Sequence, residues 1–195
     1  SLDRVDAVVV PGTKNTVDDL LALRDAGFDA ALAAFDGPVV GICGGYQLLG
    51  DRIDNAYVEG TGDRRVVDGV GRLPVATTFS TDKRVEAVTR AVSGTGPLSG
   101  ASGTVSGYEI HMGDTRALTP VDRPVGPESA AVGNVAGTYL HGLFENPTIR
   151  EAFVETVYDA AGRRRPEHDG DRERPYDAAA ALVRDHVDAS VIDLG

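Results

Sequence analysis

The residues best suited to chemistry in this chain are its single cysteine and two of its four histidines. Cys43 stands in the segment Gly-Ile-Cys-Gly-Gly, which has the G-x-C-x-G form of a nucleophile elbow. Small residues on both sides of the central position allow a sharp turn from strand to helix that exposes the central side chain. The pattern therefore predicts that Cys43 is a nucleophile at the start of a helix.

A nucleophilic thiol must lose its proton, and an ordinary cysteine is only about 3 per cent thiolate at pH 7. A helix N-terminus and a neighbouring imidazolium both favour the thiolate. The alternative is an inert buried cysteine, which is the usual fate of a lone cysteine. A buried cysteine has no need of flanking glycines, so the pattern favours the nucleophile.

A base for this thiol can come from either of two histidines. His141 ends an apolar run in Gly-Thr-Tyr-Leu-His-Gly, and His111 lies in Gly-Tyr-Glu-Ile-His-Met-Gly. Both are bordered by glycines that permit a turn toward a ligand, and both can equally be structural histidines with satisfied hydrogen bonds. The spacing alone does not separate them. His168 falls in a charged segment and His186 in a C-terminal helix, where we expect structural or solvated roles.

The elements that must position Cys43 alternate between strand and helix. Apolar runs at residues 5–10 and 38–42 predict buried strands, and residues 17–26 predict a helix capped by Asn15 or Thr16. This alternation is typical of a doubly wound parallel sheet. The loop after the first strand lacks the spacing of a phosphate-binding loop. We expect it to lie beside the elbow, where its backbone N–H groups can stabilise an oxyanion.

The sequence pattern is less specific in the rest of the chain. Glycine-rich turns between short β-type runs predict an antiparallel segment over residues 54–129, and residues 132–140 predict one or two further strands. A helix is expected at 147–160, a charged linker at 162–175 and a C-terminal helix at 176–189. We expect one α/β domain over residues 1–195, cut from a longer polypeptide.

Composition excludes several classes of function. The net charge of −11 argues against non-specific nucleic-acid binding. The sequence shows no signal peptide and no apolar run long enough to span a membrane, and a lone cysteine fits a reducing cytoplasm. Asp outnumbers Glu by 21 to 9 and Arg outnumbers Lys by 17 to 2, which is typical of adaptation to molar salt. High-GC coding is an alternative explanation for the arginines.

Several segments, in order, resemble the glutamine amidotransferase domain of cobyric acid synthase. They are VPGTKNTVDDLLALR, GPVVGICGGYQLLG, VEG, GRLPVATTF, GYEIHMG and GTYLHGLFEN, between Val8 and Phe153. The wider group is the class I, or triad, glutamine amidotransferases, whose C-x-G-x-Q pattern is matched by Cys43, Gly45 and Gln47. The resemblance implies a flavodoxin-like α/β fold with a mainly parallel, doubly wound sheet.

The resemblance also implies a reaction. Cys43 would attack the side-chain amide of L-glutamine, His141 would protonate the departing ammonia, and the thioester would be hydrolysed to glutamate. Ammonia would pass to an upstream ATP-dependent synthetase domain, absent from this chain, that amidates corrin carboxylates in cobalamin biosynthesis. ATP and Mg²⁺ would belong to that domain, and this one would need no cofactor or metal. The remaining implied site residues surround the nucleophile: Gln47 and Gly45 for substrate binding, and the N–H groups of Gly44 and of Gly12 or Thr13 for the oxyanion hole.

One position departs from the wider class. The usual third triad residue is a Glu two positions after the histidine, where this chain has Leu143. The cobyric acid synthase branch shares this absence of the Glu. Glu145, Glu109 or a group from the synthetase domain are the candidates for orienting His141. The alternatives are a sister glutaminase, from a cobyrinic acid a,c-diamide synthase or a cell-wall precursor amidase, and a cysteine hydrolase on a similar elbow. A non-catalytic interaction module would not require both Cys43 and His141.

Overall fold

The computed structural model of this protein describes residues 2–167 and 175–186. The chain divides into two compact units, residues 1–164 and 165–195. The boundary lies within the charged linker predicted at 162–175, of which residues 168–174 fall outside the described part.

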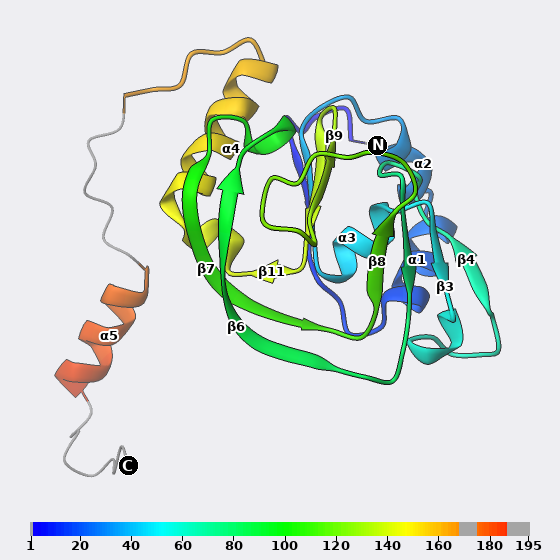
Figure 1. The fold of residues 1–195 in the computed structure, drawn as a ribbon. Helices are drawn as coiled ribbons and strands as arrows, with labels where there is room; N and C mark the ends of the chain where they lie inside the picture. The colour runs from blue at the N-terminus through cyan, green and yellow to red at the C-terminus, as the bar shows by residue number, and fades with distance from the viewer. Residues whose placement is uncertain (1, 168–174, 187–195) are drawn as a thin grey trace. The chain divides into compact units, whose positions relative to one another are not determined.

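The first unit is built on a four-stranded sheet in the order β1-β2-β10-β9. Its strands β1 (Val8–Val10), β2 (Val39–Ile42) and β10 (Val135–Thr138) are parallel, and β9 (Ala130–Val132) is antiparallel at one edge. The residues of β2 are apolar or glycine and largely buried, as a central parallel strand requires. Helix α3 (Gly44–Leu49) follows β2 almost directly and packs beside this sheet (Figure 1).

The middle of the chain, together with β11 (Leu140–His141), forms two further sheets. Their other strands are β3 (Arg52–Asp54), β4 (Val66–Asp68), β5 (Val75–Thr78), β6 (Arg84–Ser93), β7 (Ser102–His111) and β8 (Asp114–Ala117). One has the order β4-β3-β5-β8, in which only β3 and β5 are parallel. In the other, the long strands β6 and β7 form an antiparallel pair (Figure 1). Strand β11 pairs with β7 near the C-terminal end of β7, at Tyr108 and Glu109.

The predicted α/β class is confirmed, with parallel strands at the centre and antiparallel strands in the middle of the chain. The strands are shared among two mixed sheets and one antiparallel sheet instead of one large parallel sheet. Tight turns between short strands leave no room for the crossover that parallel neighbours need, so the middle strands pair mostly antiparallel.

The helices agree closely with the sequence pattern. Asn15 caps α1, since its Oδ1 accepts the backbone N–H of Asp18 at 3.2 Å. The helix predicted at 147–160 is confirmed. The helices of the first unit are α1 (Thr16–Asp25), α2 (Phe28–Ala33), α3 and α4 (Pro147–Ala160), with short 3-10 turns η1 (Ala56–Val58), η2 (Gly96–Leu98) and η3 (Leu143–Glu145).

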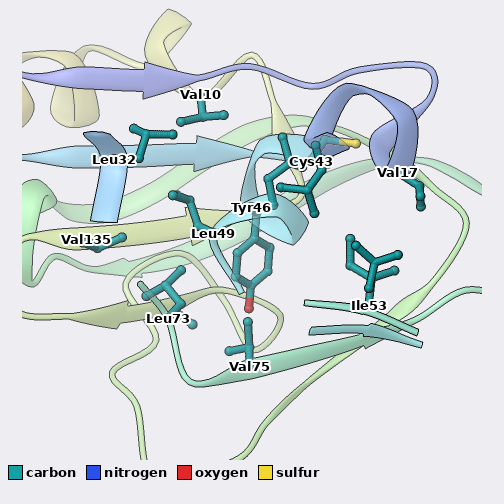
Figure 2. Close-up of a cluster of buried hydrophobic side chains, with 14 of the residues drawn as sticks. Val10, Val17, Leu32, Cys43, Tyr46, Leu49, Ile53, Leu73, Val75 and Val135 are labelled. Carbon is teal, nitrogen blue, oxygen red and sulfur yellow. The ribbon is translucent and has the colours of Figure 1, made fainter. Parts of the chain in front are cut away.

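The core of the first unit gathers around the helix that follows the elbow. Figure 2 shows Tyr46 and Leu49 of α3 among buried valines of the neighbouring strands and two further leucines, Leu32 of α2 and Leu73, with Cys43 at the margin of the cluster. Tyr46 is fully buried and touches β10, because a Cβ built on Gly137 would lie 2.0 Å from its ring. The elbow is therefore anchored through the core.

The second unit contains α5 (Pro175–His186), which confirms the C-terminal helix predicted from residue 176. The last residues of that prediction, 187–189, lie outside the described part of the chain. Within the described ranges, no helix has the length and apolar character needed to cross a membrane.

Candidate active site

Cys43 occupies the turn between β2 and α3 with φ 53° and ψ −114°. A positive φ is unusual for a residue other than glycine and is costly unless the surroundings enforce it. Here the backbone N–H of Cys43 donates to the Thr138 carbonyl at 2.8 Å, which ties the turn to the end of β10. The predicted elbow is therefore present, strained as such turns are.

Glycine is needed at the elbow because backbones approach closely there. A Cβ on Gly45 would lie 2.0 Å from the Val10 carbonyl oxygen, and one on Gly41 would lie 2.7 Å from the Gly45 carbonyl oxygen. No side chain fits at such distances. These glycines let the start of α3 pack against the end of β1, which aims Cys43 at the carboxyl edge of the sheet.

Gly12 lies between the predicted nucleophile and the predicted base. A Cβ at this position would be 3.3 Å from Cys43 Cβ and 3.4 Å from His141 Cε1. Cys43 and His141 are thus brought together around one backbone position of the loop after β1. His111 lies close enough to lower the pKa of His141 but is engaged elsewhere: its Nδ1 donates to the Gly113 carbonyl at 2.8 Å.

The predicted oxyanion groups converge on the same point. The N–H of Gly44 faces the sulfur, where its hydrogen bond opposes the rise that burial causes in the pKa of the Cys43 thiol. A Cβ on Gly44 would lie 3.0 Å from the backbone nitrogen of Thr13, so the loop after β1 borders the elbow as expected. Backbone donors from two segments can therefore reach an oxygen bound beside the sulfur.

Gln47 lies beneath the nucleophile, with 2% of its surface exposed. Its Oε1 lies 3.1 Å from the Thr16 hydroxyl and its Nε2 lies 3.2 Å from the Tyr139 hydroxyl. Both ends of the amide are thus engaged inside the protein. Gln47 therefore lies against Thr16 and Tyr139 inside the protein, and its role in substrate binding stays a prediction.

The electrostatics of the pair favour its neutral form. Burial raises the pKa of the Cys43 thiol, the Gly44 N–H opposes this, and the Glu59 carboxylate raises it further. Burial also lowers the pKa of His141, the Ile110 carbonyl opposes this as a hydrogen-bond acceptor, and His111 lowers it further. Burial of Cys43 and of His141 therefore disfavours the thiolate–imidazolium form of the pair.

Strand β7 supplies the contacts that orient His141. The Tyr108 ring stacks on the imidazole with ring centroids 4.9 Å apart and planes 2° apart. The Ile110 carbonyl accepts the Cys43 thiol at 3.2 Å as well as facing His141. Pairing of β11 with β7 sets His141 opposite Tyr108, so the strand register fixes both contacts.

The two acids predicted as orienters lie elsewhere. Glu109 is buried and its carboxylate accepts both Nε and Nη2 of Arg90, at 3.0 and 2.7 Å. Glu145 is exposed, and its carboxylate approaches the Cβ position of Gly142 at 3.6 Å. No hydrogen bond to His141 is formed by either carboxylate in the described residues.

Sequence reasoning missed Glu59, Tyr108 and the Ile110 carbonyl. Glu59 and Tyr108 lie in the VEG and GYEIHMG segments, so the family segments marked their neighbourhoods without showing their contacts. The Ile110 carbonyl carries no side-chain signal at all. Its place depends on how β7 and β11 pair, which only the folded chain shows.

Glu109, His111 and Glu128 form the one group of metal-ligand type among the described residues, with ligand atoms within 4.8 Å of one another. Arg90 pairs with Glu109, and Arg84 lies 2.8 Å from Glu128. The two carboxylates therefore already face guanidinium groups, which would repel a cation. The absence of a metal from this domain stays a prediction.

Residues 1–149 match the family described as the CobB/CobQ-like glutamine amidotransferase domain. The chain belongs to this family. It is 60% identical over 189 residues to a probable cobyric acid synthase of Halobacterium salinarum, covering 96% of this chain and 37% of that protein. A probable cobyric acid synthase of Methanocella arvoryzae is 41% identical over 198 residues, covering 98% of this chain and 40% of that protein.

A solved structure with the same fold is more distant in sequence. This crystal structure of a glutamine amidotransferase matches with a TM-score of 0.59 at 18% identity, covering 80% of this chain and 81% of that one. At such low identity the likeness concerns the fold alone. The class I glutamine amidotransferase-like fold predicted from the sequence is therefore confirmed.

Proposed function

We propose that this domain hydrolyses L-glutamine through Cys43 and delivers ammonia to an ATP-dependent synthetase that amidates corrin carboxylates, as the glutaminase part of a cobyric acid synthase. The observation that carries the proposal is the convergence of Cys43, His141 and the Gly44 N–H around Gly12. The chain spans well under half the length of the curated relatives it matches, so the amidation step belongs to a part of the protein beyond this domain.

The proposed reaction begins when the Cys43 thiol passes its proton to His141, and the resulting thiolate attacks the side-chain amide carbon of glutamine. Negative charge develops on the amide oxygen, where the backbone donors of Gly44 and of Gly12 or Thr13 would stabilise it. The carbon–nitrogen bond breaks as the His141 imidazolium gives its proton to the departing nitrogen, which leaves as ammonia. A glutamyl thioester remains on the sulfur.

Hydrolysis of the thioester completes the cycle. His141, now neutral, accepts a proton from water as the water oxygen attacks the thioester carbon. The carbon–sulfur bond then breaks, releasing glutamate and restoring the thiolate beside an imidazolium. ATP and Mg²⁺ would act on the synthetase part, which activates the carboxylate that receives the ammonia.

The test is covalent labelling with a diazoketone analogue of glutamine. We expect one label per chain, on Cys43, identified by mass spectrometry. Label on another residue, or none on folded protein, would overturn the nucleophile assignment.

A second measurement uses the complete enzyme. The Cys43→Ala variant should lose glutamine-dependent amidation and keep most of its ammonia-dependent amidation. Loss of both activities would mean that Cys43 has a structural role instead.

A further inference from the structure

Tyr139 lies between the two members of the proposed catalytic pair along the backbone. It directly follows Thr138, whose carbonyl accepts the Cys43 N–H at 2.8 Å, and it stands two residues before His141. Only 1% of its surface is exposed. Its backbone therefore joins the segment that holds the nucleophile to the segment that carries the base. No step of the proposed reaction uses its side chain.

The Tyr139 hydroxyl belongs to a chain of buried hydrogen bonds. It accepts an N–H from Gln47 Nε2 at 3.2 Å. A phenol has a single proton, and because the Gln47 amide is itself a donor, that proton is available for Thr115 Oγ1, which the hydroxyl also contacts. Thr115 Oγ1 in turn lies 2.7 Å from Thr77 Oγ1. One phenol oxygen therefore ties α3 to β8 and, through β8, to β5.

The Tyr139 ring is fixed by two other rings. His111 of β7 stacks on it with ring centroids 3.8 Å apart and planes 16° apart, and Tyr46 meets it edge to face with centroids 5.4 Å apart. The His111 imidazole is itself held, because its Nδ1 donates to the Gly113 carbonyl. A ring packed in this way cannot shift its hydroxyl without displacing a neighbour. The hydrogen bond to Gln47 therefore has a fixed direction.

Gln47 connects the Tyr139 hydroxyl to the nucleophile. It lies one helical turn after Cys43, and its backbone N–H donates to the Cys43 carbonyl at 3.1 Å. Its side-chain amide is held at both ends, because Oε1 accepts the Thr16 hydroxyl and Nε2 donates to Tyr139. The same turn carries the Gly44 N–H that faces the sulfur. We propose that Tyr139 is a positioning residue of the glutaminase site, whose hydroxyl holds the first turn of α3 through Gln47.

This inference rests on the proposed glutaminase function and adds a residue to it. Without the Tyr139 hydroxyl, Gln47 Nε2 would be buried with no acceptor, which is costly, so the amide would turn toward another partner and draw the first turn of α3 with it. A displacement of about 1 Å at the reacting atoms can cost about 100-fold in rate. A hydroxyl that touches no substrate can therefore control kcat.

The experiment compares Tyr139→Phe with Tyr46→Phe in the complete enzyme. Both changes remove a buried phenol oxygen and keep the ring, but the Tyr46 hydroxyl has no hydrogen-bond partner in the described part of the chain. Tyr139→Phe should lower kcat for glutamine hydrolysis about tenfold and change KM less than about threefold. Tyr46→Phe should leave both constants within about twofold of wild type, because no hydrogen bond is lost.

A double-mutant cycle tests whether the effect passes through Gln47. Gln47→Met keeps the length of the side chain and removes both polar ends. Adding Tyr139→Phe to Gln47→Met should lower kcat by less than about a further twofold, since the hydroxyl then has no amide to hold. Ammonia-dependent amidation should stay unchanged in every variant, which reports that the enzyme is folded. A purely structural role for Tyr139 would lower the melting temperature and leave kcat unchanged.

Thr115→Val provides a second test if Tyr139→Phe does not fold. It removes the other partner of the phenol and should lower kcat at least about threefold. If wild-type enzyme hydrolyses glutamine but the tested variant keeps its kcat, or if its effect and that of Gln47→Met simply multiply, the inference is wrong and the proposed function stands. If wild-type enzyme does not hydrolyse glutamine, both proposals fall.

Discussion

The two members of the proposed catalytic pair, Cys43 and His141, are held by different means. Cys43 is fixed by its neighbours in sequence, because Gly41 and Gly45 allow a close approach of β1, β2 and α3. His141 is fixed by β7, a strand far from it in sequence, through the Tyr108 ring and the Ile110 carbonyl. The nucleophile is thus encoded locally and the base through strand register. Substitutions around Cys43 should therefore act by steric clash, and substitutions around His141 by loss of orientation of the imidazole.

The largest effect is expected from Gly45→Ala, which acts on the nucleophile side. Its Cβ would lie 2.0 Å from the Val10 carbonyl oxygen, and neither backbone can yield without moving β1 or α3. We expect a loss of more than about 4 kcal/mol in the free energy of unfolding, measured by thermal or urea denaturation. Gly133→Ala is the control: its φ is +56° with nothing within 4 Å of the Cβ position, so it should cost only about 1 kcal/mol. Equal stability of the two variants would contradict the local account of the elbow.

The same contrast explains what could be predicted from the sequence. The elbow, the Asn15 cap and helix 147–160 depend on residues close together in the chain, and each was correctly predicted. The division into separate sheets depends on pairings between distant strands, which periodicity does not encode.

The residues of the candidate site also differ in how far local sequence predicts them. Cys43 follows from the G-x-C-x-G pattern, whereas the Gly44 N–H and the choice of His141 over His111 needed a family resemblance. Glu109 was a reasonable orienter by residue type, but its side chain points to Arg90 on the neighbouring strand. His141 pairs with Tyr108 across the two strands, and the neighbouring Glu109 faces the opposite side because alternate strand residues do so.

The second prediction tests whether Glu109 acts on stability or on His141. Glu109→Gln leaves the Arg90 guanidinium without its bidentate partner, so we expect a loss of about 2 kcal/mol in unfolding free energy, reduced from the usual 3–5 because Arg90 is partly exposed. The pH profile of glutamine hydrolysis should not move. Glu145→Gln, an exposed site, should change stability by less than about 0.5 kcal/mol. A shifted pH profile with unchanged stability would instead make Glu109 the orienter.

The third prediction concerns Tyr108, which is 49% exposed and stacks on His141. Removing the ring by Tyr108→Ala should lower kcat about tenfold through misplacement of the imidazole, with little change in KM or melting temperature. Tyr108→Phe keeps the ring and should keep most of the activity. If Phe and Ala variants lose activity equally, the hydroxyl matters and stacking does not position His141.

The fourth prediction concerns the charge state of the pair in the lone chain. Burial raises the pKa of Cys43 and lowers that of His141, so both are neutral near pH 7 and alkylation of the thiol by iodoacetamide should be slow there. The alkylation rate should rise with pH with a midpoint above that of an ordinary cysteine, because the raised pKa delays thiolate formation. Adding the synthetase part with its substrates should lower this midpoint by about one pH unit, or about 1.4 kcal/mol. An unchanged midpoint would mean that the partner does not complete the site.

The smallest effect is expected from salt, which screens charges on the surface and does not change the contacts of Cys43 or His141. The net charge of −11 and the 21 aspartates imply self-repulsion that is screened when the Debye length falls to about 3 Å at 1 M salt. We expect molar KCl to raise the melting temperature by several degrees, since about 1 kcal/mol corresponds to roughly 2–4 °C in a chain of this size. The stability deficit of Glu109→Gln should persist in that salt, because the Glu109 side chain is only 3% exposed and its pairing with Arg90 is poorly screened. A wild-type melting temperature that does not change with salt would favour coding bias as the source of the excess of aspartate and arginine. If the stability loss of Glu109→Gln disappears in molar salt, the pairing of β6 with β7 instead depends on screened surface charge.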